Sequence, residues 1–413
     1  MGYIFGVRTI MIEPIGGLAA SFVSFLVVLG VVVFVHEFGH YQVARWFKVK
    51  IESFSIGFGP ELCAWTSKAG VRWRIAALPL GGYVKFEGDK DVSSQSVSSP
   101  TFKDGIADRN SGLFHAQPVH VRAAVTAAGP LFNFGFSIAV FAIFFAIFGE
   151  MVQRPIISHV LPDGAAAAAG MKAGDEVVAI NGRKIDDFVD LQTAIMVSGG
   201  KEMALDIRRA DGAVHIRVTP KIVERQTPFG DKETQGLLGI ETRFTRETVE
   251  KRSYNPIQAL VRGGEQTANI IATQFNFILA VLRGGMSAGH INGPLGIFQI
   301  AGKVTENSVA EAGPQASAAQ VAESVGIGLV RLAAVLSVAV GFMNLLPLPV
   351  LDGGHLVFYA AEAVRGKPIP EKVQAISFQI GLACILSLFV FATFQDLERS
   401  GLFNLLKGFV AAG

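Results

Sequence analysis

The sequence predicts an α-helical polytopic membrane protein with four transmembrane helices, a membrane-associated β-hairpin sheet and an inserted α+β domain. Half of the 413 residues are hydrophobic and only 17% are charged, which is too apolar for an ordinary soluble enzyme. Four charge-free segments are long enough to cross a bilayer, and a long segment of soluble character separates the second from the third. The net charge of +2 gives no reason to expect nucleic acid as a partner.

The expected spans divide the chain into nine parts. The charge-free stretches are residues 15–35, 123–149, the segment between 331 and 352, and 373–395. The first helix and its metal motif take residues 1–40, a loop with a β-sheet 41–118, and the second helix 119–149. The α+β domain takes residues 150–242 and an amphipathic helical linker 243–320. The third helix takes residues 321–354, a short loop 355–372, the fourth helix 373–396, and a tail 397–413.

The basic residues predict the orientation of these spans. Lys and Arg gather in the loops after the first and third spans, whereas Arg8 is the only base in the N-terminal tail. Basic loops are usually cytoplasmic, so both termini and residues 150–320 are expected on the outer side. The first apolar run is too long, and its flank too poor in bases, for a cleaved signal peptide. Cys63 and Cys384 lie in different kinds of segment, so a disulfide framework is not expected.

A metal-binding motif, His36-Glu37-Phe38-Gly39-His40, stands at the downstream end of the first span. Residues four apart share one face of a helix, so His36 and His40 can present two imidazoles to one zinc ion. Glu37 would lie beside that ion, where a carboxylate can accept the proton of an attacking water. The alternative is a chance pair of helix histidines. Ionisable residues are costly inside a span, however, and the motif therefore favours zinc-dependent hydrolysis in the membrane.

A catalytic zinc ion takes three protein ligands and keeps one position open, so the motif needs a third ligand. Asp352 closes the third hydrophobic run and is the best candidate by charge. The first and third spans run in the same direction, and this topology brings Asp352 to about the depth of the two histidines. The alternative is that Asp352 only caps the span at the water interface.

Asn344, Pro347 and Pro349 precede Asp352 in the same segment. A buried amide in lipid needs partners, so Asn344 either binds another helix or donates to a substrate carbonyl or a developing oxyanion. Prolines lack the N–H and break helical pairing. They either end the helix at the interface or open irregular backbone beside a water-filled cavity, which hydrolysis would require.

Two further regions favour β-structure. Residues 71–86 alternate like strands around a Pro/Gly turn, and residues 55–60 form another Gly-rich turn. This pair is either a plain hairpin or a sheet whose edge receives an extended substrate. In the inserted domain, strands are expected at 156–160, 176–180 and within 204–218, with a helix at 187–197. It holds no acid–base or metal cluster, which favours a binding or gating role.

Residues 255–282 have helical periodicity and are expected to lie along the outer membrane surface.

These motifs resemble the site-2 protease family of intramembrane zinc metalloproteases, in its regulated-intramembrane-proteolysis subgroup. The likeness rests on residues 36–40, the NxxPxPxLDGG pattern of 344–354, the LPLGGYV of 78–84 and the AGPLFN of 128–133. Residues 165–184 resemble a PDZ domain of the bacterial periplasmic type, found once here although the best-known members carry two. The resemblance implies a reaction centre with zinc ligands His36, His40 and Asp352 and the general base Glu37. It implies substrate-binding roles for Asn344, Pro347, Pro349, Gly57 and Gly59.

The resemblance also implies partners and a location. Family substrates are single-span membrane proteins, often anti-sigma factors, that an upstream site-1-type protease has already trimmed. Signal-peptide remnants are an alternative class of substrate that fits the sequence equally well. The expected protein is a zinc metalloendopeptidase of the bacterial inner membrane, acting in stress response. Its active site would lie near the cytoplasmic face of the lipid bilayer, and its PDZ-like domain and both termini in the periplasm. The alternatives are a non-catalytic membrane PDZ scaffold and a metal or ion transporter.

Overall fold

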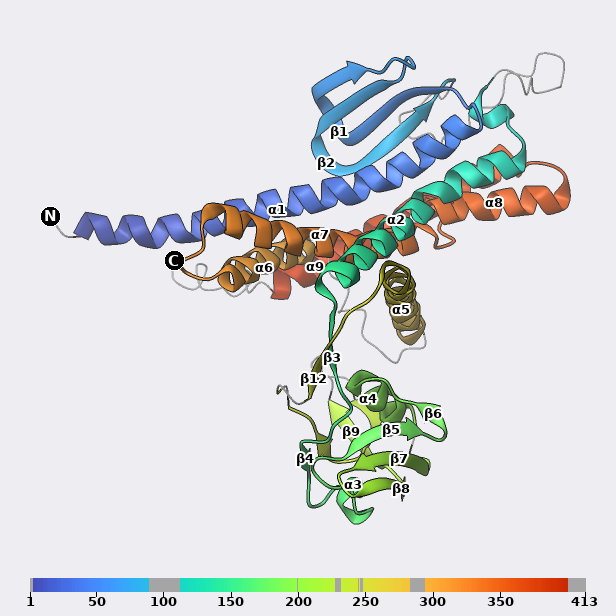
Figure 1. The fold of residues 1–413 in the computed structure, drawn as a ribbon. Coiled ribbons are helices and arrows are strands. Elements are labelled where there is room, and N and C mark those ends of the chain that lie inside the picture. The colour runs from blue at the N-terminus through green and yellow to red at the C-terminus, as the bar shows by residue number, and fades with distance from the viewer. Residues whose placement is uncertain are drawn as a thin grey trace, which may run out of the picture. The chain divides into compact units, whose positions relative to one another are not determined.

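The chain folds into two compact units (Figure 1). The computed structural model describes residues 3–88, 112–198, 200–226, 232–243, 245, 248–282 and 294–399. The helical unit comprises residues 1–142, 260–279 and 288–413. The second unit comprises residues 143–259 and 280–287, so it is inserted into the sequence of the first.

The helical unit is built around four long helices. Its described helices are α1 (Tyr3–Trp46), η2 (Phe114–Ala116), α2 (Val119–Phe148), α5 (Pro256–Leu282), α6 (Pro294–Ala312), α7 (Ala318–Asn344), α8 (Asp352–Arg365) and α9 (Glu371–Arg399). The last turn of α2 and part of α5 belong to the second unit. Among the described residues, four helical segments are long and apolar enough to cross a membrane: 17–46, 119–148, 318–344 and 372–395. This result confirms the expectation of four spans.

The third of these helices differs from the expected span at both ends. It begins at Ala318, because Ser317 and Gln320 form a capping box there. It ends at Asn344, three residues before Pro347, so the segment from 345 to 351 is not helical. The charge-free stretch extends past the helix because proline, and not charge, ends the regular backbone.

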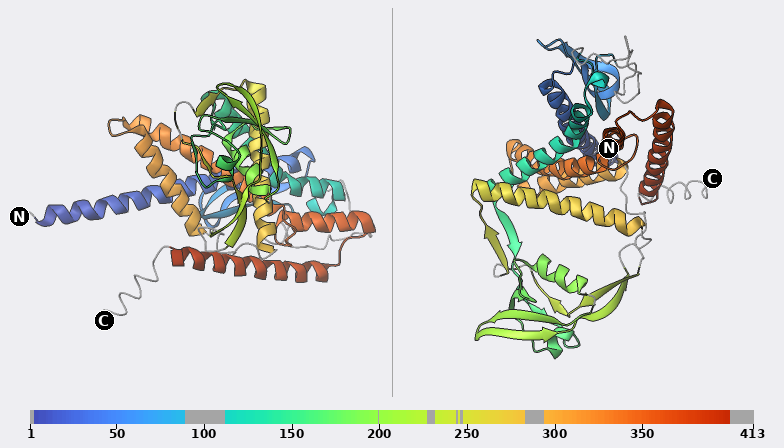
Figure 2. Two further views of the ribbon diagram at one scale, coloured as in Figure 1. Left: turned by 90° about the horizontal axis from the view of Figure 1, so that it is seen from below. Right: turned by 90° about the vertical axis from the view of Figure 1, so that its right-hand side faces the viewer.

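Helices α1, α6 and α7 pack side by side (Figures 1 and 2). Val28 and Val32 of α1 are buried against Ala333 of α7. Ser24 Oγ and Thr305 Oγ1 share a hydrogen bond of 2.8 Å between α1 and α6. Only 11% of the apolar window of α9 is buried, which leaves most of that helix for lipid. Because α6 packs into this bundle, the region expected as a linker contributes to the helical unit itself.

The strands β1 (Ile51–Thr66) and β2 (Arg72–Phe86) form a curved sheet that rests on α1. Segment 51–56 pairs with 82–86 on one side and with 72–75 on the other, and 72–75 also pairs with 63–66. Gly57, Gly59 and Gly81 have φ values of 90°, 87° and 149° where the two strands bend. Phe54 is fully buried, and its ring lies 5.6 Å from that of Tyr41 on α1. Aromatic packing therefore fixes the sheet against the helix that carries the metal motif.

The second unit has one antiparallel sheet of four strands, in the order β6-β5-β7-β8. Its elements are β3 (Glu150–Gln153), β4 (His159–Val160), α3 (Ala165–Ala168), β5 (Glu176–Ile180), β6 (Arg183–Lys184), α4 (Phe188–Val197), β7 (Met203–Arg209), β8 (Gly212–Val218), β9 (Lys221–Gln226), β10 (Lys232–Leu237), β11 (Ile240–Glu241) and β12 (Val249–Arg252). Leu191 and Ile195 of α4 are buried with Val177, Leu205 and Ile207 of the sheet. The alternating burial of β7 explains this packing, because one face of the sheet is apolar.

Most of the expected elements of this unit form. Asn181 and Gly182 make the turn between β5 and β6, with φ values of 50° and 79°. Asp187 caps α4 by accepting a hydrogen bond of 2.8 Å from the Asp190 N–H. The expected strand at 156–160 is shorter than predicted: β4 covers only His159–Val160, and Ile156 makes an isolated bridge to Glu176.

Candidate active site

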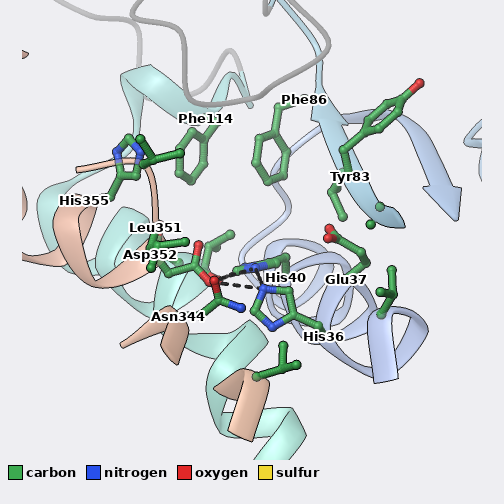
Figure 3. A pocket seen from close by; sticks show the side chains of 18 of the residues that line it. His36, Glu37, His40, Tyr83, Phe86, Phe114, Asn344, Leu351, Asp352 and His355 are labelled. Atoms are coloured by element: carbon green, nitrogen blue, oxygen red, sulfur yellow. Dashed lines mark hydrogen bonds and ion pairs between the residues drawn. The ribbon is translucent and has the colours of Figure 1, made fainter. Parts of the chain in front are cut away.

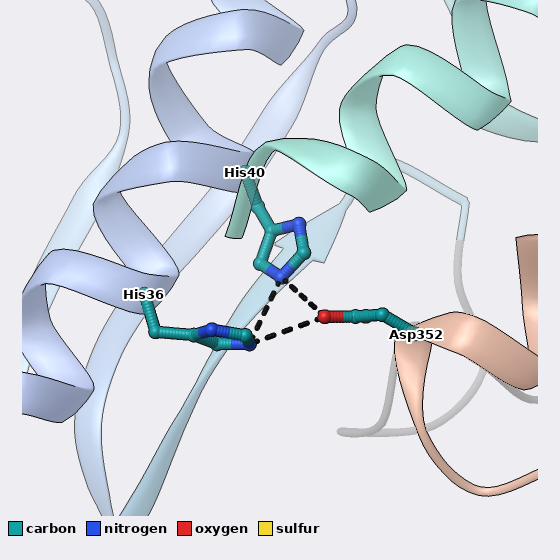
Figure 4. A group of neighbouring side chains, drawn as sticks. All are labelled: His36, His40 and Asp352. Carbon is teal, nitrogen blue, oxygen red and sulfur yellow. Dashed lines mark hydrogen bonds and ion pairs between the residues drawn. The ribbon is translucent and has the colours of Figure 1, made fainter. Parts of the chain in front are cut away.

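The helix α1 brings His36 and His40 into contact, as their spacing predicts (Figure 4). Their Nε2 atoms lie 3.3 Å apart. His36 and Glu37 are buried, and 13% of the His40 side chain remains exposed. The Nδ1 of His40 lies 2.8 Å from the carbonyl oxygen of Val125, which can only accept a hydrogen bond. Nδ1 of His40 therefore carries a proton, which leaves Nε2 as the nitrogen that can bind a metal ion.

Asp352 completes this cluster from a distant part of the sequence. It is the first residue of α8, and its Oδ2 lies 3.2 Å from His36 Nε2 and 3.4 Å from His40 Nε2. The Asp352 side chain is only 7% exposed. The structure thus places Asp352 beside the two histidines, as the direction of the spans predicts. Among the described residues, these three form the group that could hold a metal ion.

The three atoms have the spacing of metal ligands. A tetrahedron with bonds of about 2.05 Å, typical for zinc to nitrogen or oxygen, has edges of about 3.3 Å. The observed separations are 3.2, 3.3 and 3.4 Å. Two imidazole nitrogens and a carboxylate oxygen that converge at these distances need a cation between them, either a proton or a metal ion. The residues present therefore fit a zinc ion with three protein ligands.

Two glycines allow α1 and α2 to cross at this point. A Cβ on Gly39 would lie 2.4 Å from the carbonyl oxygen of Ala128. A Cβ on Gly129 would lie 2.4 Å from His40 Nε2 and 2.8 Å from His36 Cε1. The sequence predicts no role for Gly129, which it shows only as part of the AGPLFN block of residues 128–133. Its signal is the spacing of Gly129, Asn133 and Ser137, which are four residues apart and share one face of an otherwise apolar helix.

The loop before α8 shapes the approach of Asp352. A Cβ on Gly353 would lie 2.3 Å from the carbonyl oxygen of Leu345, and one on Gly354 would lie 2.3 Å from that of Leu348. The two glycines therefore let the first turn of α8 lie directly on the loop. Pro347 and Pro349 belong to this loop and do not line the cavity that opens beside the three-residue cluster. Pro349 instead packs near Gly381 of α9.

A cavity of about 560 Å³ opens onto the cluster (Figure 3). His36, Glu37, His40 and Asp352 line it, and the Glu37 carboxylate lies beside Tyr83 in the close-up view. The remaining lining residues include Gly81, Gly82, Tyr83, Val84, Phe86, Phe114, Asn344, Leu351, His355 and Tyr359. Asn344, the last residue of α7, thus faces the same space as Glu37. A cavity of this volume has room for water beside Glu37, and hydrolysis requires water at that position.

The sheet approaches this cavity through β2. A Cβ on Gly82 would lie 2.7 Å from the Cγ of Glu37 and 2.7 Å from the carbonyl oxygen of Ser55. Glycine at this position lets the strand pass directly over the Glu37 side chain. Gly57 and Gly59 lie at the bend of β1, and it is Phe58 between them that lines the cavity.

Comparisons with known proteins agree with this geometry. The model of peptidase family M50 matches residues 24–388 of the chain. A protein of Agrobacterium fabrum, whose name is that of a zinc metalloprotease, is 40% identical over 383 residues, which cover 93% of this chain and 97% of the relative. Metalloprotease MmpA of Caulobacter vibrioides is 38% identical over 411 residues, covering 95% and 99% of the two chains. The chain belongs to peptidase family M50, the site-2 protease family, and is a zinc metalloprotease.

Proposed function

We propose that this zinc metalloprotease cleaves the transmembrane segments of single-span membrane proteins, of the anti-sigma-factor type, after another protease has trimmed them. The main support is the position of the reaction centre. His36, Glu37 and His40 belong to a helix of spanning length, and the cavity beside them is also lined by Asn344 at the end of another. A hydrolytic centre between such helices suits a peptide bond that comes from within the bilayer. The scaffold and transporter alternatives are set aside, because the chain belongs to a peptidase family.

The proposed roles follow from the positions of the side chains. His36, His40 and Asp352 hold the zinc ion, which when bound supplies Lewis-acid activation of the scissile carbonyl and the attacking water. Glu37 accepts a proton from that water and returns it to the leaving amine. Asn344 donates a hydrogen bond to the substrate backbone or to the developing oxyanion.

The sheet is proposed to hold the substrate in an extended form. Gly81, Gly82, Tyr83 and Val84 line the cavity from β2, next to Glu37. Cleavage needs an extended backbone, and a strand can align one through main-chain hydrogen bonds. Gly57 and Gly59 contribute through the bend that places Phe58 at the cavity. Pro347 and Pro349 contribute by fixing the loop that carries Asp352.

The proposed setting is the bacterial inner membrane, with the reaction centre near its cytoplasmic face. The basic loops support this orientation, which places both termini and the second unit in the periplasm. We further propose that the second unit is PDZ-like and excludes substrates that an upstream site-1-type protease has not yet trimmed. Its antiparallel sheet, covered by α4 over a single apolar core, supports this assignment.

The proposal is tested with a tagged single-span substrate in detergent and in vesicles. Wild type, Glu37→Gln and Asp352→Ala are compared for cleavage and for bound zinc by mass spectrometry. Wild type should cut within the span, Glu37→Gln should keep zinc without cutting, and Asp352→Ala should lose both. Cleavage by Glu37→Gln would disprove the role of Glu37. Wild type that holds zinc but cuts only soluble peptides would disprove the intramembrane function.

A further inference from the structure

A buried amide on α2 touches one of the two histidines. Asn133 is fully buried, and its side-chain amide lies 3.2 Å from His36 Nδ1, with Nδ2 as the nearer atom. Its Oδ1 has no hydrogen-bond partner among the described residues. A buried polar atom left without a partner costs about 1–3 kcal/mol. This unsatisfied atom, beside a metal ligand, calls for a functional explanation.

Metal binding dictates which nitrogen of His36 carries the proton. An imidazole binds zinc through the lone pair of Nε2 only when its proton is on Nδ1, and that N–H then needs an acceptor. His40 meets this requirement through the Val125 carbonyl, 2.8 Å from its Nδ1. The oxygen and nitrogen of an amide exchange places by a half-turn of the group. In the turned orientation, Oδ1 of Asn133 receives the hydrogen bond from His36.

We propose that Asn133 is a positioning residue that accepts the His36 Nδ1–H hydrogen bond and so holds the tautomer that presents Nε2 to zinc. The inference rests on the zinc site and does not depend on the substrate proposed above. It assigns to each histidine one fixed acceptor from α2: the Val125 carbonyl for His40 and the Asn133 amide for His36.

The surroundings of Asn133 hold it in place. Its backbone carbonyl accepts hydrogen bonds from Ser137 Oγ at 2.9 Å and from Ser337 Oγ at 3.1 Å. The Ser137 hydroxyl also lies 2.7 Å from the carbonyl oxygen of Ala334, so this turn of α2 is tied to α7. A Cβ on Gly341 would lie 3.1 Å from the Asn133 Cβ, which shows how closely α7 approaches. The packing of α2 on α7 therefore fixes the position of the amide.

The test compares zinc affinity, measured by competition with a chromophoric chelator, in the full-length protein in detergent. Asn133→Leu removes the acceptor at similar volume and should weaken zinc binding by about 10–100-fold. Asn133→Asp keeps an acceptor and should bind zinc nearly as tightly as wild type. Ser24→Ala is the control, because it removes a buried hydroxyl that shares a hydrogen bond with Thr305 on α6 and does not contact His36 or Asn133. It should lower the melting temperature and leave zinc affinity unchanged.

Two outcomes would overturn the inference. One is wild-type zinc affinity in Asn133→Leu. The other is an equal loss in Asn133→Asp and Asn133→Leu, which would make the amide a donor to His36. If Asn133→Leu does not fold, Asn133→Asp is examined by proton NMR after substitution with Co²⁺. The exchangeable N–H resonance of one ligand histidine should then shift, and an unchanged spectrum would contradict the proposal.

Zinc binding by wild type without cleavage of any span would count against the proposed function alone.

Discussion

Gly129 provides the most direct test of the metal centre at the level of a single residue. A methyl group at this position would lie 2.4 Å from His40 Nε2, on backbone that the α1–α2 crossing holds in place. Gly129→Ala should therefore lower zinc affinity at least as much as the loss of a ligand-orienting group, about 10–100-fold, and abolish cleavage. The measurements are metal content and the zinc dissociation constant.

Gly135→Ala is the matched control for this experiment. Gly135 lies on the same helix, and nothing lies within 4 Å of the position that its Cβ would take. The control should bind zinc like wild type, with a helix that is slightly more stable because alanine has the higher helix propensity. Equal zinc affinity in Gly129→Ala and Gly135→Ala would mean that the helices can separate at the crossing.

The candidate metal ligands could be predicted from the sequence, but the residues whose role depends on close packing between elements could not. His36 and His40 are recognised by a spacing that any helix converts into one shared face. Asp352 is distant in sequence, but the directions of two spans place it at the right depth. Gly82 and Asn133 could not be assigned roles in this way. Gly82 matters because strand β2 contacts Glu37 of α1, and Asn133 because α2 contacts His36 of α1. A local sequence pattern cannot predict such contacts between distant segments.

At the level of elements, an ion pair links the last part of α8 to the start of α2. Arg122 Nη2 lies 2.6 Å from Glu362 Oε1, and both side chains are about 15% exposed or less. The Arg122 guanidinium also lies 4.9 Å from the centre of the Tyr359 ring. Asp352 is at the other end of α8, so this contact helps to fix the helix that carries the candidate third ligand.

In the second unit, the buried carboxylate of Asp175, directly before β5, links this strand to Arg209 at the end of β7. Asp175 is fully buried and accepts hydrogen bonds from Arg209 at 2.7 and 2.8 Å and from the Lys172 N–H at 2.8 Å. Burial alone would raise the pKa of Asp175, but these hydrogen bonds and the positive charges hold it below its ordinary value. The folded unit therefore favours the ionised form.

This arrangement predicts the pH dependence of the second unit. A depressed folded-state pKa gives stability that is complete above the unfolded value of about 3.9 and is lost as the pH falls through the folded value. Asp175→Asn should destabilise the unit by about 3 kcal/mol at pH 7, because Arg209 then lacks its partner. The difference should shrink below about pH 4. Amide hydrogen exchange of β5 and β7 at pH 7 and pH 3 measures both effects, and a difference independent of pH would refute them.

At the scale of the whole molecule, the division into two units predicts where zinc stabilises the protein. The candidate ligands all belong to the helical unit. At free zinc 1,000 times the dissociation constant, binding should stabilise that unit by about 4 kcal/mol. Removal of zinc by a chelator should speed hydrogen exchange in α1, α2 and α8, and leave β5 and β7 unchanged. Faster exchange in both units would mean that they unfold together.

The connection between the units allows their roles to be separated. Most of the second unit lies between β3 and β12, and these strands pair from Glu150 with Arg252 to Gln153 with Val249. Replacement of residues 154–248 by a two-residue turn such as Asn-Gly would convert this pair into a short hairpin. The helical unit holds the three candidate zinc ligands and Glu37, so the shortened protein should bind zinc and cut a trimmed substrate as wild type does.

The informative comparison is a substrate that keeps its full periplasmic domain. If the second unit excludes such substrates, wild type should cut the untrimmed form slowly, and the shortened protein should cut trimmed and untrimmed forms at similar rates. The same excision with Glu37→Gln should cut neither, which rules out a contaminating protease. Continued rejection of the untrimmed substrate by the shortened protein would place the selection in the helical unit, where the approach to the cavity between α1, β2 and α7 would then decide what enters.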